Sequence, residues 1–201
     1  MFTELIGLLT ATKIIIAMPE TYQPWPEPQQ IATQSATAGP VKVTYNTEIW
    51  GTVNADFADF KTKVAETLND SRGWVRAGVT FTEVTGPADF TIILSDTAHL
   101  EALPGCSGEL SCTTWSNQVI INDLRWLYGT TASNAAGVST RDYQHMVVNH
   151  EVGHWLGHYN HIESCSNGGP APIMLQQSTG LRGCDSFNSW PIASELWTKF
   201  N

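Results

Sequence analysis

His150, Glu151 and His154 lie within five consecutive residues of this chain. On a helix, two residues that are four apart project from the same face about one turn apart, so both imidazoles can reach one metal ion. The glutamate beside the first histidine is then placed to act on a metal-bound water instead of binding the metal. The spacing therefore predicts a metal site on a helix, with Glu151 as the catalytic residue.

A glycine follows this motif and can end the helix. Gly157 can adopt a left-handed conformation that turns the chain back. A third ligand can then come from just beyond it, where the chain has both His158 and His161. Three protein ligands with one position left for water are typical of catalytic zinc.

The predicted chemistry is hydrolysis of an amide bond with Zn²⁺ as the cofactor. Bound zinc lowers the pKa of its water to about 7. Glu151 would accept the proton of that water and later deliver it to the leaving amine. The metal would also stabilise the oxyanion of the tetrahedral intermediate.

Residues 150–161 resemble the metzincin signature His-Glu-x-x-His-x-x-Gly-x-x-His, and Ala171-Pro172-Ile173-Met174 resembles the methionine turn that follows it. More narrowly, residues from about 41 to 191 resemble predicted secreted zincin-like peptidases of actinobacteria, which are described only as a domain of unknown function. The matching segments are residues 86–91, 119–122 with Arg125 and Trp126, 147–154, 169–177 and 181–184. This resemblance implies a metzincin-like fold, zinc and proteolysis.

The chain departs from the signature at the third ligand. The signature histidine falls three residues after the glycine, where this chain has Asn160, and His161 comes one residue later. Asparagine is a poor zinc ligand because it is neutral and hard. A loop after the glycine can absorb one extra residue, so we predict His161 as the third ligand, with His158 as the alternative. Met174 would pack under the imidazoles without binding zinc.

Another class of zincin takes its third ligand from a downstream glutamate. Glu195 and the nearer Glu163 are the candidates for that role, but either would leave the methionine turn unexplained. Two further histidines are expected to have no metal role. His145 is expected at the surface and His99 in a loop.

The four cysteines are Cys106, Cys112, Cys165 and Cys184, and no two of them form a Cys-x-x-Cys pair. Four buried free thiols are one interpretation. We favour two disulfides, which imply an oxidising compartment. Of the three possible pairings we favour Cys106–Cys112 and Cys165–Cys184, because each closes a short loop that contains glycine or serine. The second loop would enclose Met174.

Composition narrows the class of protein. The 201 residues suffice for one domain with a sizeable core, and 42% of them are hydrophobic. The net charge of −9 disfavours nucleic acid as a partner because such a surface repels phosphate. We expect a monomer that acts on a protein or peptide substrate.

Three parts are predicted along the chain. Residues 1–18 form a signal-like apolar segment that Glu4 and Lys13 interrupt, and a plain N-terminal strand or tail is the alternative. Residues 19–40 form a linker rich in Pro, Gln and Thr, and residues 41–201 form the zincin-like domain. We therefore expect a secreted protein whose mature domain has no membrane span.

The elements that would position the motif predict an α+β domain. Alternating or apolar runs predict strands over residues 41–45, 79–84, 88–94, 111–115 and 118–121. Helices are predicted over 55–69 with Asn54 as the cap, over 141–156 with Ser139 or Thr140 as the cap, and over 191–200. Trp126 and Tyr128 are expected in the core. The order predicts a twisted mixed sheet with two main helices, one of them the zinc helix, and an irregular C-terminal subdomain with the methionine turn.

The leading hypothesis is a secreted zinc endopeptidase. A catalytically inactive zinc-binding module is one alternative, although Glu151 argues against it because nothing structural requires a carboxylate there. The other alternative is an amidase that acts on cell-wall peptide or another non-protein amide.

Overall fold

A computed structural model of the chain describes residues 39–201. The predicted signal-like segment at 1–18 and most of the predicted linker at 19–40 lie outside the described residues. Within residues 39–201, no helix has both the length and the apolar character needed to cross a membrane.

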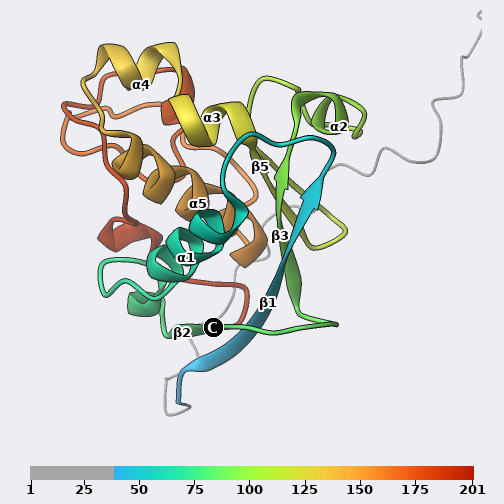
Figure 1. Ribbon diagram of the computed structural model, residues 1–201. Coiled ribbons are helices and arrows are strands. Elements are labelled where there is room, and N and C mark those ends of the chain that lie inside the picture. The colour runs from blue at the N-terminus through green and yellow to red at the C-terminus, as the bar shows by residue number, and fades with distance from the viewer. Residues whose placement is uncertain (1–38) are drawn as a thin grey trace, which may run out of the picture. The chain divides into compact units, whose positions relative to one another are not determined.

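The described residues form a mixed five-stranded sheet in the order β2-β1-β3-β5-β4 (Figure 1). The first four strands in that order run parallel, and β4 pairs antiparallel with β5 at one edge. The strands are β1 (Val41–Trp50), β2 (Val79–Glu83), β3 (Phe90–Ser95), β4 (Cys112–Thr114) and β5 (Gln118–Asn122). All five predicted strands are present, although β1 is longer than predicted.

The central strand β3 is apolar in succession because both faces of the sheet are covered. Ile92 and Leu94 pack into the main core, where α1 (Phe57–Leu68) and α5 (Thr140–Leu156) lie. Ile93 points to the opposite face and packs with Leu100 of α2 (Thr97–Glu101). Figure 1 shows α1 and α5 on one side of the sheet and α2 on the other.

Helix α1 lies within the predicted range and buries Phe60, Val64 and Leu68 on one face. Its cap, however, is Asp56, whose carboxylate accepts the backbone N–H of Asp59, so the predicted Asn54 cap is wrong. The reason is tertiary. Both the backbone N–H and the side-chain amide of Asn54 donate to the buried carboxylate of Asp123 instead.

Helix α5 is the central helix, and it is buried all round from Tyr143 to Leu156. Ser139 caps its first turn, and Gly157 ends it in the left-handed conformation with φ of 118°, as the sequence predicted. Contacts with α1, β4 and β5 fix its position. Two shorter helices, α3 (Asp123–Tyr128) and α4 (Thr131–Ala135), connect the sheet to it.

The predicted helix over 191–200 is wrong. Residues 157–201, all of them described, contain no α-helix, and their helical turns are the short 3-10 helices η2 (Gln177–Thr179) and η3 (Ala193–Glu195). A further 3-10 helix, η1 (Trp74–Ala77), follows α1. Backbone groups of this stretch bond elsewhere: the Lys199 N–H donates to the Leu156 carbonyl, and the Thr198 N–H donates to the Asn201 side chain. These tertiary and local hydrogen bonds replace the helical pattern that the apolar spacing indicated.

Trp126 is buried as expected, but Tyr128 is 66% exposed because α3 ends there, at the edge of the core. Both predicted disulfides, Cys106–Cys112 and Cys165–Cys184, are confirmed, and no cysteine is free. The α+β class and the mixed sheet are confirmed as well.

Candidate metal centre

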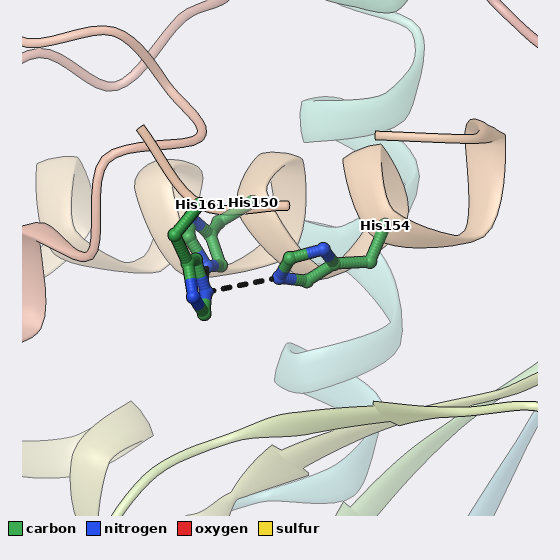
Figure 2. A group of neighbouring side chains, drawn as sticks. All are labelled: His150, His154 and His161. Atoms are coloured by element: carbon green, nitrogen blue, oxygen red, sulfur yellow. Dashed lines mark hydrogen bonds between the residues drawn. The ribbon is translucent and has the colours of Figure 1, made fainter. Parts of the chain in front are cut away.

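Three imidazoles converge at the end of α5. His150 and His154 project from the helix, and His161 reaches them from the following loop (Figure 2). The Nε2 atom of His161 lies 3.2 Å from the Nε2 atoms of both other histidines. Zinc–nitrogen bonds of about 2.0–2.1 Å in a tetrahedral arrangement place two ligand nitrogens about 3.3 Å apart. The three residues therefore fit a metal ion such as zinc.

Backbone carbonyls fix the tautomers of the two helical histidines. Nδ1 of His150 donates to the carbonyl of Ile173 at 2.7 Å, and Nδ1 of His154 donates to the carbonyl of His158 at 2.7 Å. A carbonyl can only accept, so each Nδ1 holds the proton and each Nε2 presents a lone pair to the centre. This is the usual arrangement around histidines that bind a metal.

Burial keeps these histidines neutral. It holds the pKa of His150 well below its ordinary value, and the neighbouring His154 and His161 add to the effect. Burial and the nearby His161 lower the pKa of His154 to about 4. Neutral imidazole is the form that binds metals, so the site is ready for an ion at neutral pH.

The turn at Gly157 places the third histidine. The N–H of His158 bonds back to the Gly153 carbonyl, which directs the chain away from the helix axis. Ile162 then donates its N–H to the Met174 carbonyl at 3.0 Å and forms a bridge with Leu175. His161 is therefore positioned by its neighbour, which is held against the methionine turn (residues 171–174).

His158 lies outside this group. Its Nε2 atom lies 3.0 Å from the carbonyl of Trp197, and its ring packs on Trp197 with 3.8 Å between the centroids. Glu163, the other sequence candidate in this loop, lies 3.7 Å from Arg182 at the surface. The structure brings His161 to His150 and His154, and its role as the third ligand stays a prediction.

Glu151 follows His150 in the sequence, and its side chain is buried. A residue of the edge strand β4 holds it in place. The hydroxyl of Thr113 in β4 lies 2.8 Å from the Glu151 carboxylate and 2.8 Å from its backbone carbonyl. Burial raises the pKa of Glu151 to about 8, and the Thr113 hydrogen bond opposes that rise. Sequence reasoning missed Thr113, because only the fold brings β4 to α5.

Met174 packs against α5 between the two histidines of the motif. It is 1% exposed. A Cβ atom at Gly153 would lie 2.5 Å from the sulfur of Met174 and 2.9 Å from the ring of Trp74. The glycine inside the motif is therefore what allows the methionine turn to approach the helix.

Glu195 does not belong to the histidine group. Its carboxylate accepts backbone N–H groups from Ile173, Met174 and Ile192 at 2.8–2.9 Å. The residue is 3% exposed. Glu195, the alternative metal ligand, therefore bonds the backbone of the methionine turn instead. No local sequence pattern indicates this contact.

The other histidines lie apart from the centre. His145 was expected at the surface, but it is buried: its Nδ1 atom lies 2.9 Å from the Thr67 hydroxyl and its ring packs on Trp190. Partners from α1 and from the C-terminal part of the chain cover it, which its position on α5 alone does not reveal. His99 lies on α2 instead of a loop, bonded to Asp96.

Fold and site together define an α+β domain with a three-histidine group that could hold a metal ion. Residues 18–191 match a family described as "Protein of unknown function (DUF3152)", and the chain belongs to that family. No curated protein gives a significant match to the chain.

Proposed function

We propose that this protein is a secreted, zinc-dependent endopeptidase. The observation that carries the proposal is the convergence of the Nε2 atoms of His150, His154 and His161 next to the buried Glu151. No fourth histidine, cysteine or carboxylate joins these three among residues 39–201. Three protein ligands leave one coordination position, which distinguishes a catalytic zinc site from a structural one.

Zinc bound by these residues would supply a Lewis acid that polarises the substrate carbonyl and acidifies a water molecule. Glu151 would accept the proton at its carboxylate and return it to the leaving nitrogen. The hydroxyl of Thr113, 2.8 Å from this carboxylate, holds it in place. The His150 and His154 side chains are held for binding by their Nδ1 hydrogen bonds.

Two further features support a metzincin-like peptidase. The methionine turn lies against the helix that carries the motif, where Gly153 makes room for it. The edge strand β4 lies beside the same helix and runs antiparallel to β5. An extended peptide could pair with such an edge, which supports a protein or peptide as the substrate. The two disulfides support secretion.

The first test compares the wild-type protein with Glu151→Gln on a mixed peptide library. We expect chelator-sensitive cleavage by the wild-type protein, a loss of more than about 1,000-fold in the variant, and one zinc per chain in both. Bound zinc without cleavage of any library would indicate the inactive binding module. Cleavage confined to cell-wall peptides would indicate the amidase.

A second test compares His161→Ala with His158→Ala by measuring the zinc content of each purified protein. Removing His161 takes away one of three nitrogens, so zinc should be lost on dialysis. Removing His158 should leave the zinc content at one per chain, because its ring packs on Trp197 outside the group. Full zinc content in His161→Ala would overturn the assignment.

A further inference from the structure

Glu195 is a buried carboxylate whose oxygens are all engaged by backbone N–H groups. Its Oε1 atom accepts from Met174 at 2.8 Å, and its Oε2 atom accepts from Ile173 and Ile192 at 2.9 Å each. Two of the three donors are consecutive residues of the methionine turn. The carboxylate of η3 therefore fixes the backbone of a segment that lies more than twenty residues earlier in the chain.

The peptide group between Ile173 and Met174 is bonded on both sides. Its N–H, on Met174, donates to Glu195, and its carbonyl, on Ile173, accepts from Nδ1 of His150 at 2.7 Å. One planar amide thus separates the carboxylate from the histidine. The next carbonyl, on Met174, accepts the N–H of Ile162, the neighbour of His161.

We infer that Glu195 is a positioning residue of the metal centre, acting on His150 through the peptide between Ile173 and Met174. The inference rests on the proposed metal site. A negative charge on the N–H side of an amide polarises the group and increases the electron density on its carbonyl oxygen. That oxygen then accepts a stronger hydrogen bond from Nδ1 of His150. The stronger bond orients the ring and makes the lone pair on Nε2 a better ligand for a metal ion.

Glutamine at position 195 cannot do the same. It carries one acceptor oxygen, and its amide nitrogen would face a backbone N–H in place of the second carboxylate oxygen. The methionine turn would lose a hydrogen bond, and the Ile173 carbonyl would lose its polarisation. His154 should be unaffected, because its Nδ1 partner is the His158 carbonyl.

Asp123 offers a matched control. It is also a buried carboxylate, 1% exposed, that accepts backbone N–H groups, here from Asn54 and Ala55. None of its hydrogen bonds leads to a histidine of the centre. Asp123→Asn should therefore lower the stability of the domain, because a buried carboxylate that accepts backbone N–H groups is lost. It should leave the metal site unchanged.

The experiment compares the wild-type protein, Glu195→Gln and Asp123→Asn. Nitrogen NMR of the imidazoles in the metal-free protein should show His150 as the Nδ1–H tautomer in the wild type and in Asp123→Asn. In Glu195→Gln, the His150 signals should shift toward a mixture of tautomers. Zinc affinity, measured by chelator competition, should fall about 10- to 100-fold in Glu195→Gln and less than twofold in Asp123→Asn.

The inference would be overturned if Glu195→Gln left the His150 signals and the zinc affinity unchanged while its unfolding midpoint fell as much as that of Asp123→Asn. Glu195 would then have only a structural role. Should Glu195→Gln not fold, Glu195→Asp keeps the charge but shortens the reach, and it should show the same effects in smaller measure. Failure of the wild-type protein to bind zinc would overturn the proposed function, while the His150 tautomer in metal-free protein would still decide the inference.

Discussion

The sheet half (residues 39–156) and the C-terminal segment (residues 157–201) satisfy their backbone polar groups in different ways. In the sheet half, strand ladders and helices do so, and apolar side chains fill the core. The C-terminal segment has no α-helix, and polar side chains form hydrogen bonds with its backbone groups. Gln177 donates to the carbonyls of Pro172 and Asn188, and Asn188 donates to those of Ala171 and Trp190.

This difference matters for the candidate site, because the site takes residues from both the sheet half and the C-terminal segment. The sheet half supplies His150, Glu151 and His154 on α5, whereas the C-terminal segment supplies His161 and Met174. Regular backbone tolerates changes of side chain that irregular backbone does not. Stability and metal binding should therefore respond differently to substitutions on the two sides.

The largest effect on stability is expected from Ile92→Ala in β3. This side chain is fully buried at the centre of the sheet, and its truncation should lower the free energy of unfolding by about 2–5 kcal/mol. The zinc affinity of the folded protein should stay unchanged, because the C-terminal segment keeps its hydrogen bonds. Denaturant unfolding and chelator competition measure the two quantities, and a matching loss of zinc affinity would break the comparison.

Removing the disulfide between Cys165 and Cys184 should have the next largest effect. The bond closes a loop over a sequence separation of 19 residues that contains the methionine turn, and its loss should cost about 3 kcal/mol. We expect the double alanine variant to lose zinc affinity and activity at denaturant concentrations where near-UV dichroism is still native.

The control for that variant is removal of the bond between Cys106 and Cys112, which closes a shorter loop before β4. Its loss should cost about 2 kcal/mol and leave zinc affinity unchanged in the folded protein. Coincident loss of zinc, activity and near-UV dichroism in the Cys165 and Cys184 variant would contradict a separate response of the C-terminal segment.

The smallest effect at neutral pH is expected from His145, where α1 of the sheet half and Trp190 of the C-terminal segment both contact α5. Its contribution is a pH dependence of stability that appears only in acid. Burial lowers the pKa of His145 to about 4. The charged groups around it are Arg141 and Arg72, which lower its pKa, and Asp70 and Asp142, which raise it.

An unfolded chain has an ordinary histidine pKa of about 6.5. Between that pH and about 4 the unfolded state therefore binds the proton that folded His145 resists, so stability falls as the pH falls through this window. His145→Gln should lack this part of the decline. Parallel stability curves for the two proteins from pH 7 to pH 4 would show that His145 does not contribute.

Local patterns predicted much of the sheet half from the sequence. The buried face of α1, the cap and the end of α5, and the five strands each depend on neighbouring residues, and both disulfides closed the short loops that were favoured. The histidine group followed from helical spacing and a nearby loop. The residues that determine each of these features lie within about twenty residues of one another in the sequence.

The C-terminal segment was predicted less well because its structure depends on distant partners. Ile192, Leu196 and Phe200 have helical spacing, yet Glu195 turns inward to bond the methionine turn, and no helix forms. The burial of His145 likewise depends on Trp190, which is far along the chain. Such contacts carry no periodic signal, so sequence reasoning could not reveal the role of Glu195.

Gly153 has a consequence for protein engineering. Alanine is favoured over glycine inside a helix by about 1 kcal/mol, so Gly153→Ala would be an early choice in any attempt to make α5 more stable. Here the added methyl group would meet the sulfur of Met174 and the rigid ring of Trp74. The substitution that improves most helices would push the methionine turn away from this one. A thermostable form of the protein should therefore be sought on the exposed surface of the sheet half, with the middle of the motif left as it is.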